Sequence, residues 1–468
     1  MTSIQFDYST LSTSISRSEL GSIINRHIVE NEYDINEEAS SEGSSTTNEI
    51  YVHPPPPDRY KLVYLTFGLL GIGTLLPWNF FITANDFWMY KFRSTTNTTC
   101  VHTYNKTDLQ AAFTSYLAVA NNVPYVIFLI LCTLYNNRLS KMLRIIMPLI
   151  VMFILFATVT ACVEVNTDSW QMGFFSLTIL IIIILGVVSA LLNAGVTGVA
   201  SLLPAKYMHI MVLGQALAGV LAAVFQILSL LGHCDSVKSA LIYFFAADAV
   251  IVFTLIAYGG IQKSTFFIHH MCTIKDATVL KDVAEPQIMT NLSIFVLLKM
   301  IWPYAVSVLI TFWVTIGIFP GLSVLALPET HDSLWGGKLF LPLTCFLMFN
   351  VSDLCGRAVG GWLPVPQSRR MQLLSACISR IAFFPLIMLS NLHPRRNLPI
   401  IFPSDIYFVA FMTLLGFTNG YSVASALLIG VKSVSPSLQE QAGVILSAFL
   451  GGGLMLGAFT SYICIQII

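Results

Sequence analysis

Apolar segments of about 20 residues recur along most of this chain, and each is long enough to cross the hydrocarbon core of a bilayer, which is roughly 30 Å thick. The chain has 468 residues, of which 55% are hydrophobic and only 10% are charged. A soluble domain of this length carries far more charge on its surface. The sequence therefore predicts an all-α membrane protein with many spanning helices.

Eleven spans can be placed along the sequence. They are expected at 62–84, 113–134, 143–163, 174–202, 208–231, 239–260, 300–322, 338–362, 371–391, 405–430 and 440–466. The longest polar connection, residues 261–299, divides this set into six helices and five. We therefore expect an N-terminal six-helix bundle at 59–260, a cytosolic loop at 261–299 and a C-terminal five-helix bundle at 300–468.

The first 58 residues differ in composition from the rest of the chain. They are rich in Ser, Thr, Asn and Glu and end in the proline run 54–57, so they cannot form an apolar core. Residues 1–60 hold ten acids and three bases, which leaves 14 of the 24 acids and 21 of the 24 bases for the rest. We expect residues 1–58 to be a disordered acidic tail in the cytosol, and not a signal peptide.

Two short patterns in this tail resemble sorting signals. Tyr8 to Leu11 reads Tyr-Ser-Thr-Leu, which fits a tyrosine-based signal, and Glu19 followed by Ile23 and Ile24 is a loose acidic dileucine signal. Such signals recruit clathrin adaptors, which would direct the protein to endosomes and lysosomes. Both patterns are short enough to arise by chance.

The distribution of charge between loops predicts the orientation of the chain. Arg138, Lys141 and Arg144 gather around the loop after the second span, whereas Glu164 and Asp168 lie in the next loop. Because cytosolic loops carry an excess of Lys and Arg, the basic loop is expected in the cytosol. The N-terminus is then cytosolic, and the C-terminus is lumenal or extracellular.

Two glycosylation sequons agree with this orientation. Asn97 and Asn105 each begin an Asn-X-Thr triplet in the first loop, which the predicted topology makes lumenal or extracellular. The adjacent arginines at 395–396 disagree, since they fall in a loop that the same topology places outside. The charge bias is statistical, and we keep the orientation.

The nine cysteines lie mostly within apolar runs, where a free thiol behaves as a small apolar side chain. They show neither metal-binding spacing nor a disulfide framework. Cys100 and Cys234 are best placed in loops, and the sequence leaves open whether they pair. The chain has no ATP-binding motif, zinc-protease helix or nucleophile elbow. We expect no enzymatic activity, no metal or other cofactor, and no nucleic-acid partner.

A charged block interrupts the eighth expected span. Asn350, Asp353 and Arg357 are three and four residues apart, so they share one helix face, with the acid one turn before the base. Charge at membrane depth costs several kcal/mol unless it is paired or faces water, so such groups usually mark a substrate or ion pathway. A purely structural pair that joins two helices is the alternative.

Other spans also contain polar or aromatic groups, which together indicate a wet interior. They are Trp78, Asn79, Asn193, Asp248, Arg380 and Asn419. Asp248 has no basic neighbour in its own span, so it is a candidate proton site. The simpler alternative is that this carboxyl group has a structural role and forms a hydrogen bond with a neighbouring helix. Trp78 could line a pathway or simply pack.

Several long segments match one known family. They are 71–81, beginning Gly-Ile-Gly-Thr-Leu-Leu-Pro-Trp-Asn, and the block 349–357, together with 202–205, 214–219, 333–342 and 416–421. From about residue 58 onward the chain resembles the equilibrative nucleoside transporters. The long acidic tail, the short central loop and residues 170–175 look most like the lysosomal branch of that family.

The resemblance implies an eleven-helix relative of the major facilitator fold, whose two bundles of six and five helices rock about a central site. It implies facilitative transport of nucleosides, such as adenosine and uridine, or of nucleobases. By position, the residues that would contact the base are Trp78, Leu75, Ile82 and Asn193. Asp353 and Arg357 would bind the ribose hydroxyls, and the residues beside them would be Asn350, Phe346 and Leu454. Arg144 and Glu440 match a gate on the cytosolic side. The family often has Gln where this chain has Asn193, which is one methylene shorter.

The sequence leaves two alternatives open. An organic cation or monoamine carrier of the same family would need extra unpaired acids in its cavity, and Asp248 is the obvious candidate. A receptor that binds nucleosides without moving them is the second, although the short loops offer no signalling domain. For location, the late endosome or lysosome membrane is the first expectation and the plasma membrane the second.

Overall fold

The computed structural model describes residues 56–93, 108–135, 141–231, 236–271, 294–329, 339–393, 395 and 397–468. The predictions for residues 1–55 of the tail, for the sequons at Asn97 and Asn105, and for Cys100 and Cys234 lie outside these residues. Asp58, the last residue of the expected tail, is described and accepts hydrogen bonds from the backbone amides of Val63 and Tyr64.

The described chain folds almost wholly into helices. They are α2 (Leu62–Thr83), α3 (Asn85–Lys91), α4 (Asp108–Leu134), α5 (Lys141–Glu164), α6 (Gln171–Ser201), α7 (Ala205–Leu231), α8 (Ser236–Ile261), α10 (Ile294–Ile318), α11 (Met348–Trp362), α12 (Arg370–Ser379), α13 (Phe383–Met388), α14 (Asp405–Lys432) and α15 (Gln439–Ile467). The predicted all-α class is confirmed.

Within the described residues, nine helices are long and apolar enough to cross a membrane, and Val119–Leu134 is a shorter apolar stretch. The expected spans at 113–134 and 338–362 are not among the nine. In the second of these, α11 is only 15 residues long and follows a π-helical turn at Pro342–Leu347. The count of eleven therefore stays a prediction.

Two helices differ from the expected boundaries. Helix α10 begins at Ile294, inside the segment expected to be a loop, because residues 294–298 are all apolar and continue the helix. The expected span 371–391 is broken by a 3-10 turn at Arg380–Ala382 and ends at Met388. Pro385 follows that turn and cannot donate a backbone hydrogen bond to the residue four positions earlier, which accounts for the break.

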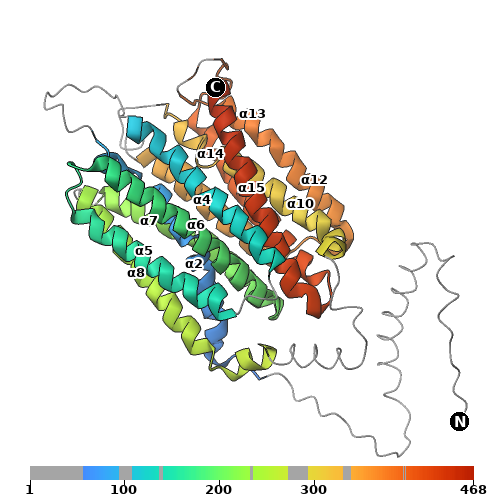
Figure 1. The fold of residues 1–468 in the computed structure, drawn as a ribbon. Helices are drawn as coiled ribbons and strands as arrows, with labels where there is room; N and C mark the ends of the chain where they lie inside the picture. The colour runs from blue at the N-terminus through green and yellow to red at the C-terminus, as the bar shows by residue number, and fades with distance from the viewer. Residues whose placement is uncertain are drawn as a thin grey trace, which may run out of the picture. The chain divides into compact units, whose positions relative to one another are not determined.

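We call helices α2 to α8 the N-terminal half and helices α10 to α15 the C-terminal half. In the N-terminal half α2 packs on α7, α4 on α6, and α5 on both α6 and α8; in the C-terminal half α10 packs on α15 and α11 on α14. The halves meet where α15 contacts α4 and α6, and where α11 contacts α7. Figure 1 shows α5 and α8 on one side and α10 and α12 on the other, with α4, α6 and α15 between them.

Glycines allow two helix pairs to approach backbone to backbone. In the N-terminal half, a Cβ atom added to Gly71 of α2 would overlap with the carbonyl oxygen of Met211 in α7. In the C-terminal half, a Cβ atom at Gly356 of α11 would overlap with the carbonyl oxygen of Phe417 in α14. Close crossings of this kind allow extensive van der Waals contact inside a membrane, where no hydrophobic effect drives helices together.

Replacing Gly420 with alanine is expected to destabilise the protein by about 2 kcal/mol, because overpacking a tight contact forces the backbone to shift. An added Cβ atom would overlap with the carbonyl oxygen of Asp353 and lie 2.6 Å from the amide nitrogen of Arg357. Thermal unfolding of the purified protein in detergent measures the effect. The matched control is Gly259→Ala, since an added Cβ atom there meets nothing within 4 Å. Equal melting temperatures for the two variants would contradict the close crossing.

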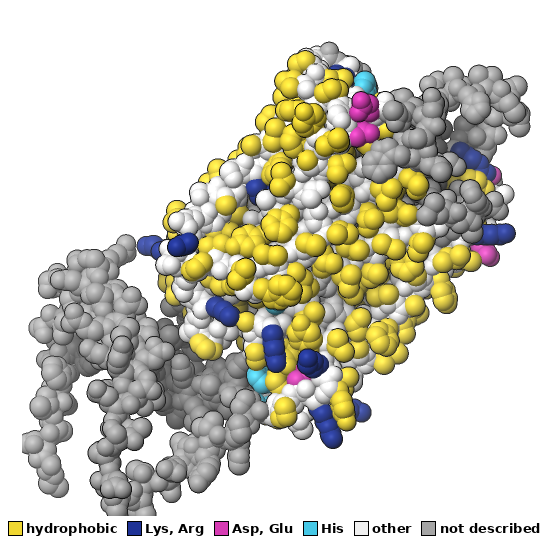
Figure 2. Space-filling model, turned by 180° about the vertical axis from the view of Figure 1, so that it is seen from behind, with side chains coloured by type: hydrophobic (Ala, Val, Ile, Leu, Met, Phe, Trp, Pro, Cys, Tyr) yellow, Lys and Arg dark blue, Asp and Glu magenta, His cyan; other side chains and the backbone are white. Residues whose placement is uncertain are grey.

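The outer surface is suited to lipid. Hydrophobic side chains cover the middle of the face seen in Figure 2, and many of the Lys and Arg side chains lie toward its margins. Large apolar side chains on several helices are exposed, among them Phe245, Phe295 and Ile406. The nine apolar helices and this surface identify an integral, multi-pass membrane protein.

Arg395 has a structural reason to occupy its loop. Its guanidinium donates hydrogen bonds to the carbonyl oxygens of Met388, Ser390, Leu392 and Leu398, at 2.6 to 3.4 Å. Partial burial lowers the pKa of this arginine from its ordinary value. The basic residue that disagreed with the charge bias thus holds the loop after α13 together.

Candidate functional site

The charged block forms a buried ion pair on α11. Arg357 Nε lies 2.9 Å from Asp353 Oδ2, and the two side chains are only 3% and 5% exposed. The spacing of four residues puts them on one helix face, as the sequence predicted. A pair buried this deeply needs further hydrogen bonds to satisfy the remaining polar atoms.

Those hydrogen bonds come from both halves of the protein. In the C-terminal half, Asn419 Nδ2 of α14 donates to Asp353 Oδ1 at 2.6 Å. From the N-terminal half, Arg357 Nη1 donates to the carbonyl oxygen of Val212 and to Gln215 Oε1 of α7, both at 3.1 Å. The ion pair therefore lies at the contact between the two halves.

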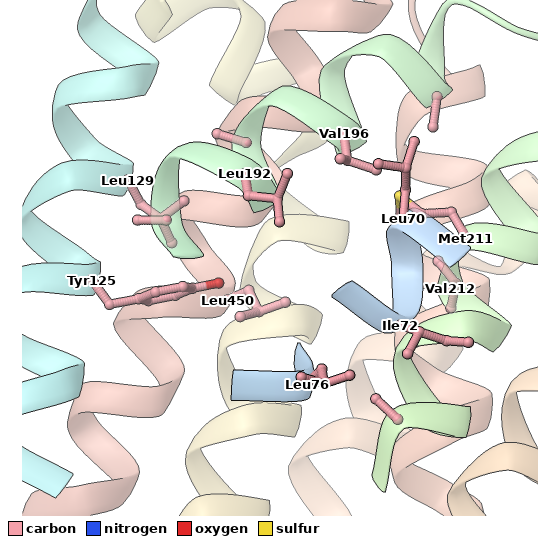
Figure 3. Packing of buried hydrophobic residues seen from close by; sticks show 14 of the residues in the cluster. Leu70, Ile72, Leu76, Tyr125, Leu129, Leu192, Val196, Met211, Val212 and Leu450 are labelled. Carbon is pink, nitrogen blue, oxygen red and sulfur yellow. The ribbon is translucent and has the colours of Figure 1, made fainter. Parts of the chain in front are cut away.

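The hydrogen-bonded chain continues through the N-terminal half. Gln215 Nε2 donates to Asn193 Oδ1 of α6 at 3.2 Å, and Asn193 Nδ2 donates to the hydroxyl of Tyr125 in α4 at 2.8 Å. Figure 3 shows Tyr125 extending from α4 toward Leu450, with its hydroxyl at the inner end of the ring. Four helices of the two halves are thus linked from Tyr125 to Arg357.

Asn350 also lies against the opposite half. Its Nδ2 donates to the carbonyl oxygen of Phe346 at 2.9 Å, and its side chain packs on Gly219 of α7, where an added Cβ atom would overlap with it. Gly219 therefore leaves the space that the Asn350 amide occupies.

Another ion pair connects α5 with α15 and so joins the two halves directly, at the end of the protein where these two helices begin. Arg144 Nη2 lies 2.7 Å from Glu440 Oε1, with side-chain exposures of 4% and 21%. Two glycines of α6 make room for this pair. A Cβ atom at Gly195 would lie 2.7 Å from Arg144 Cβ, and one at Gly198 would lie 3.2 Å from Glu440 Cγ. Glu440 is in the first turn of α15, where the helix dipole favours an acid.

The same end is closed by contacts between α7 and α11. His209 Nε2 lies 3.2 Å from the carbonyl oxygen of Arg357, and its ring occupies the space where Gly361 would carry a side chain. Nearby, Ser201 of α6 packs on Gly443 of α15. In this structure the two halves are therefore in contact at the end that carries Arg144 and Glu440.

Solved structures with the same arrangement of helices are major facilitator transporters. The human organic anion transporter MFSD10 (TETRAN) matches with a TM-score of 0.55 at 13% identity, over 88% of this chain and 95% of that one. The proton:xylose symporter XylE, solved with 6-bromo-6-deoxy-D-glucose, matches with a TM-score of 0.53 at 12% identity, over 86% of both chains. The predicted major-facilitator-like fold is confirmed, whereas the count of eleven helices and their division into six and five stay predictions.

The sequence itself matches a family model described as "Nucleoside transporter" over residues 177–466, which is more than half of the chain. The chain belongs to the nucleoside transporter family. Equilibrative nucleoside transporter 1 of Rattus norvegicus is 33% identical over 455 residues, covering 87% of this chain and 98% of the relative. Equilibrative nucleoside transporter 3 of Rattus norvegicus is 32% identical over 420 residues, covering 86% of this chain and 88% of the relative. Equilibrative nucleoside transporter 1 of Homo sapiens is 32% identical over 448 residues, covering 87% of this chain and 98% of the relative.

This member of the nucleoside transporter family has its expected base-contacting residues on α2. Leu75, Trp78 and Ile82 are spaced three and four residues apart, so they share one face of the helix, and all three are half-buried. Pro77 precedes Trp78 inside the same helix. Leu454 of α15 is also half-buried.

Two other residues expected to line the site are more deeply buried than those on α2. Phe346 is 8% exposed and packs edge-to-face on Phe319. Asn193 is 1% exposed, and both ends of its amide are bonded to Gln215 and Tyr125. The shorter amide noted in the sequence is therefore held inside the chain of hydrogen bonds.

Asp248 lies apart from the ion pair of the transporter, on α8. Its Oδ2 accepts a hydrogen bond from Thr160 of α5 at 2.8 Å. The carboxyl group therefore has the hydrogen bond from a neighbouring helix that was the alternative to a proton site. Among the described residues, its Oδ1 is buried without a hydrogen-bond partner.

Three polar residues of the hydrogen-bonded network that contains the ion pair were not assigned to the site from sequence: Tyr125, Gln215 and Thr315. Gln215 stands in the segment 214–219 that carried the family resemblance, so a signal was present. Tyr125 and Thr315 had none, because tyrosine and threonine are common in spanning helices and only the packing of the helices selects these two.

Proposed function

We propose that this protein carries nucleosides across a membrane down their concentration gradient, by alternating access between the two halves. Membership of the nucleoside transporter family and the major facilitator fold support this proposal. The observation that carries it is the buried pair of Asp353 and Arg357, placed where the halves meet.

The chemistry of the site suits a nucleoside, which joins a flat apolar ring to a sugar rich in hydroxyl groups. We assign the ribose hydroxyls to Asp353 and Arg357, because a charged acceptor and donor form strong hydrogen bonds with hydroxyls. We assign the base to the α2 face of Leu75, Trp78 and Ile82, since an indole ring packs well on a flat ring. Asn193, Phe346, Asn350 and Leu454 would complete the lining.

The charges in the C-terminal half favour this cargo over an organic cation. Asp353 is already bonded to Arg357, and the buried Arg380 adds a second positive charge nearby. Among the described residues around this pair, an ammonium group would meet no carboxylate without a basic partner. Asp248, the other acid considered, lies in the other half and is bonded to Thr160.

The contacts between the halves suggest which state this structure represents. We propose that Arg144 and Glu440 form the cytosolic gate and that the structure is closed on the cytosolic side. The orientation of the chain, with the N-terminus in the cytosol, is part of this proposal. Contacts between α7 and α11 would add to the seal.

Flux measurements on the purified full-length protein in proteoliposomes test the proposed function. Uptake of labelled uridine or adenosine should saturate, and should stop when the concentrations inside and outside are equal. Excess uridine should compete with labelled adenosine, whereas serotonin should not. Tight nucleoside binding without any flux would instead favour a receptor, and competition by serotonin alone would favour a cation carrier.

The free carboxylate oxygen of Asp248 supports a second, separate proposal, that transport is linked to protons. Acidifying the lumenal side should then accelerate uridine flux in the native protein, and the Asp248→Asn variant should lose this acceleration while keeping its flux at neutral pH. Thr160→Val, which removes the hydrogen bond to Asp248, should shift the response without abolishing it. A native protein with no response to lumenal acid would rule out proton linkage.

The location of the protein is also a proposal. We infer a late endosomal or lysosomal membrane, with clathrin adaptors binding the signals at Tyr8 to Leu11 or at Glu19, Ile23 and Ile24. Colocalisation of the full-length and tail-deleted proteins with a lysosomal marker tests this. A full-length protein at the plasma membrane would contradict it.

Glycosylation at Asn97 and Asn105, which the orientation requires, is tested by a mobility shift after endoglycosidase treatment.

A further inference from the structure

A second guanidinium is buried in the C-terminal half, close to the ion pair. Arg380 is 2% exposed and lies at the break between α12 and α13, with its side chain directed between α10 and α14. Nη1 donates to the carbonyl oxygen of Thr311, and Nη2 to that of Leu415; Nε donates to the Thr418 hydroxyl. All of these partners are neutral.

A buried positive charge is costly without a compensating negative charge. In the described part of the chain, Arg380 forms no ion pair within 4.0 Å, and Asp353 is the acid to which its side-chain hydrogen bonds lead. Two hydrogen-bonded side chains connect the two charges. Arg380 Nη2 donates to Thr315 Oγ1 at 2.8 Å, Thr315 Oγ1 lies 2.7 Å from Asn419 Oδ1, and Asn419 Nδ2 lies 2.6 Å from Asp353 Oδ1.

The direction of each hydrogen bond in this relay is fixed by its two ends. A guanidinium can only donate and a carboxylate can only accept. Thr315 therefore accepts from Arg380, and its own proton is free for Asn419 Oδ1, in competition with the carbonyl oxygen of Thr311 at 2.8 Å. Asn419 is then held with its carbonyl oxygen toward Thr315 and its NH2 group toward Asp353.

From this geometry we infer that Arg380 is a positioning residue for the sugar site, acting on Asp353 through Thr315 and Asn419. The relay fixes one carboxylate oxygen of Asp353 from the α14 side while Arg357 fixes the other from α11. The carboxylate is then held in one orientation, with its remaining lone pairs available to ribose hydroxyls. This inference rests on the proposed function, since it deepens the assignment of Asp353 to the sugar.

The neighbouring threonines provide a matched pair of variants. Thr315 and Thr418 both bond to Arg380, but only Thr315 continues to Asn419 and Asp353. Thr315→Val removes the relay and leaves Arg380 bonded to Thr311, Leu415 and Thr418. Thr418→Val removes one bond to Arg380 and leaves the relay intact.

The readout is the preference for uridine over 2′,3′-dideoxyuridine, measured as the ratio of the two kcat/KM values in proteoliposomes. A change that merely loosens the helices lowers both values together, whereas a misplaced Asp353 lowers only the value for the substrate with hydroxyls. Thr315→Val should reduce the preference by about tenfold, as expected for a lost hydrogen bond to a charged group, and Thr418→Val should leave it within about twofold. Thr315→Ser, which keeps the hydroxyl, should restore the preference.

Unchanged preference in Thr315→Val, or an equal loss in Thr418→Val, would overturn the inference while leaving the proposed function standing. If Thr315→Val is too unstable to transport, the shifts in melting temperature caused by uridine and by the dideoxy analogue give the ratio of the two binding affinities, which should fall in the same way. A native protein that moves no uridine would overturn the proposed function and this inference with it.

Discussion

Nucleoside flux through the Asp353→Ala variant is expected to fall by about 100-fold or more, since about 3 kcal/mol of lost interaction corresponds to that factor in rate. The substitution leaves the guanidinium of Arg357 buried without its acid, and it removes the acceptor that we assign to the ribose hydroxyls. It also frees the amide of Asn419. Initial rates of uridine uptake in proteoliposomes, corrected for the amount of folded protein, measure the effect.

A double variant separates a binding role from a structural one. In Asp353→Asn with Arg357→Gln, no charge of the pair remains buried, so stability should recover relative to Asp353→Ala. If the pair only joined helices, flux should recover as well; if it binds ribose, flux should stay low. The control is Asp168→Ala, which breaks an ion pair of similar length with Arg93 whose side chains are 34% and 37% exposed. Exposed pairs contribute little, so that variant should transport within about twofold of the native rate.

Reversing the charge of Arg144 is the second change with a large expected effect. Arg144→Glu places two carboxylates where an arginine and a glutamate now lie 2.7 Å apart, with the Arg144 side chain only 4% exposed. The closed end should then open, and flux should fall by roughly tenfold or more because one of the two alternating states is depopulated. Adding Glu440→Arg restores opposite charges and should recover much of the flux.

Opening of this end can be followed directly with a cysteine at position 201. Ser201 is buried against Gly443, between α6 and α15. In a background without exposed cysteines, Ser201→Cys should react slowly with a membrane-impermeant maleimide, and faster once Arg144→Glu is added. Normal flux and unchanged labelling in Arg144→Glu would show that the ion pair does not act as a gate.

Apolar run length and helical periodicity predicted most features that lie within a single helix, such as its position and the residues that share one of its faces. Most spans were expected within a few residues of their observed bounds, the exceptions being those that contain α10, α11 and the break after α12, and the spacing of Asp353 and Arg357 predicted a pair on one helix face. The break at Arg380–Ala382 was missed, although Pro385 marked it, because a proline in a spanning helix is compatible with a kink or with a tightened turn. The family resemblance, rather than spacing, brought Arg144 together with Glu440, which lies 296 residues away.

The relay to Arg380 could not be predicted from sequence, and its middle member shows why. Thr315 also bonds the carbonyl oxygen four residues earlier, as threonines in helices commonly do, so nothing local distinguishes it from other threonines. Its role depends on the rotation of α10 relative to α14, which is set by packing along the whole length of both helices. Asn193 is similar: the sequence identified the residue, but only the structure shows its amide bonded to Gln215 and Tyr125.

The bonds from Arg357 to Val212 and Gln215 have a consequence for the transport cycle. The guanidinium that we assign to the cargo also joins the two halves. A nucleoside that engages this group weakens a contact which must break before the closed end can open. Cargo therefore lowers the barrier to its own passage, and the loaded carrier should change sides faster than the empty one.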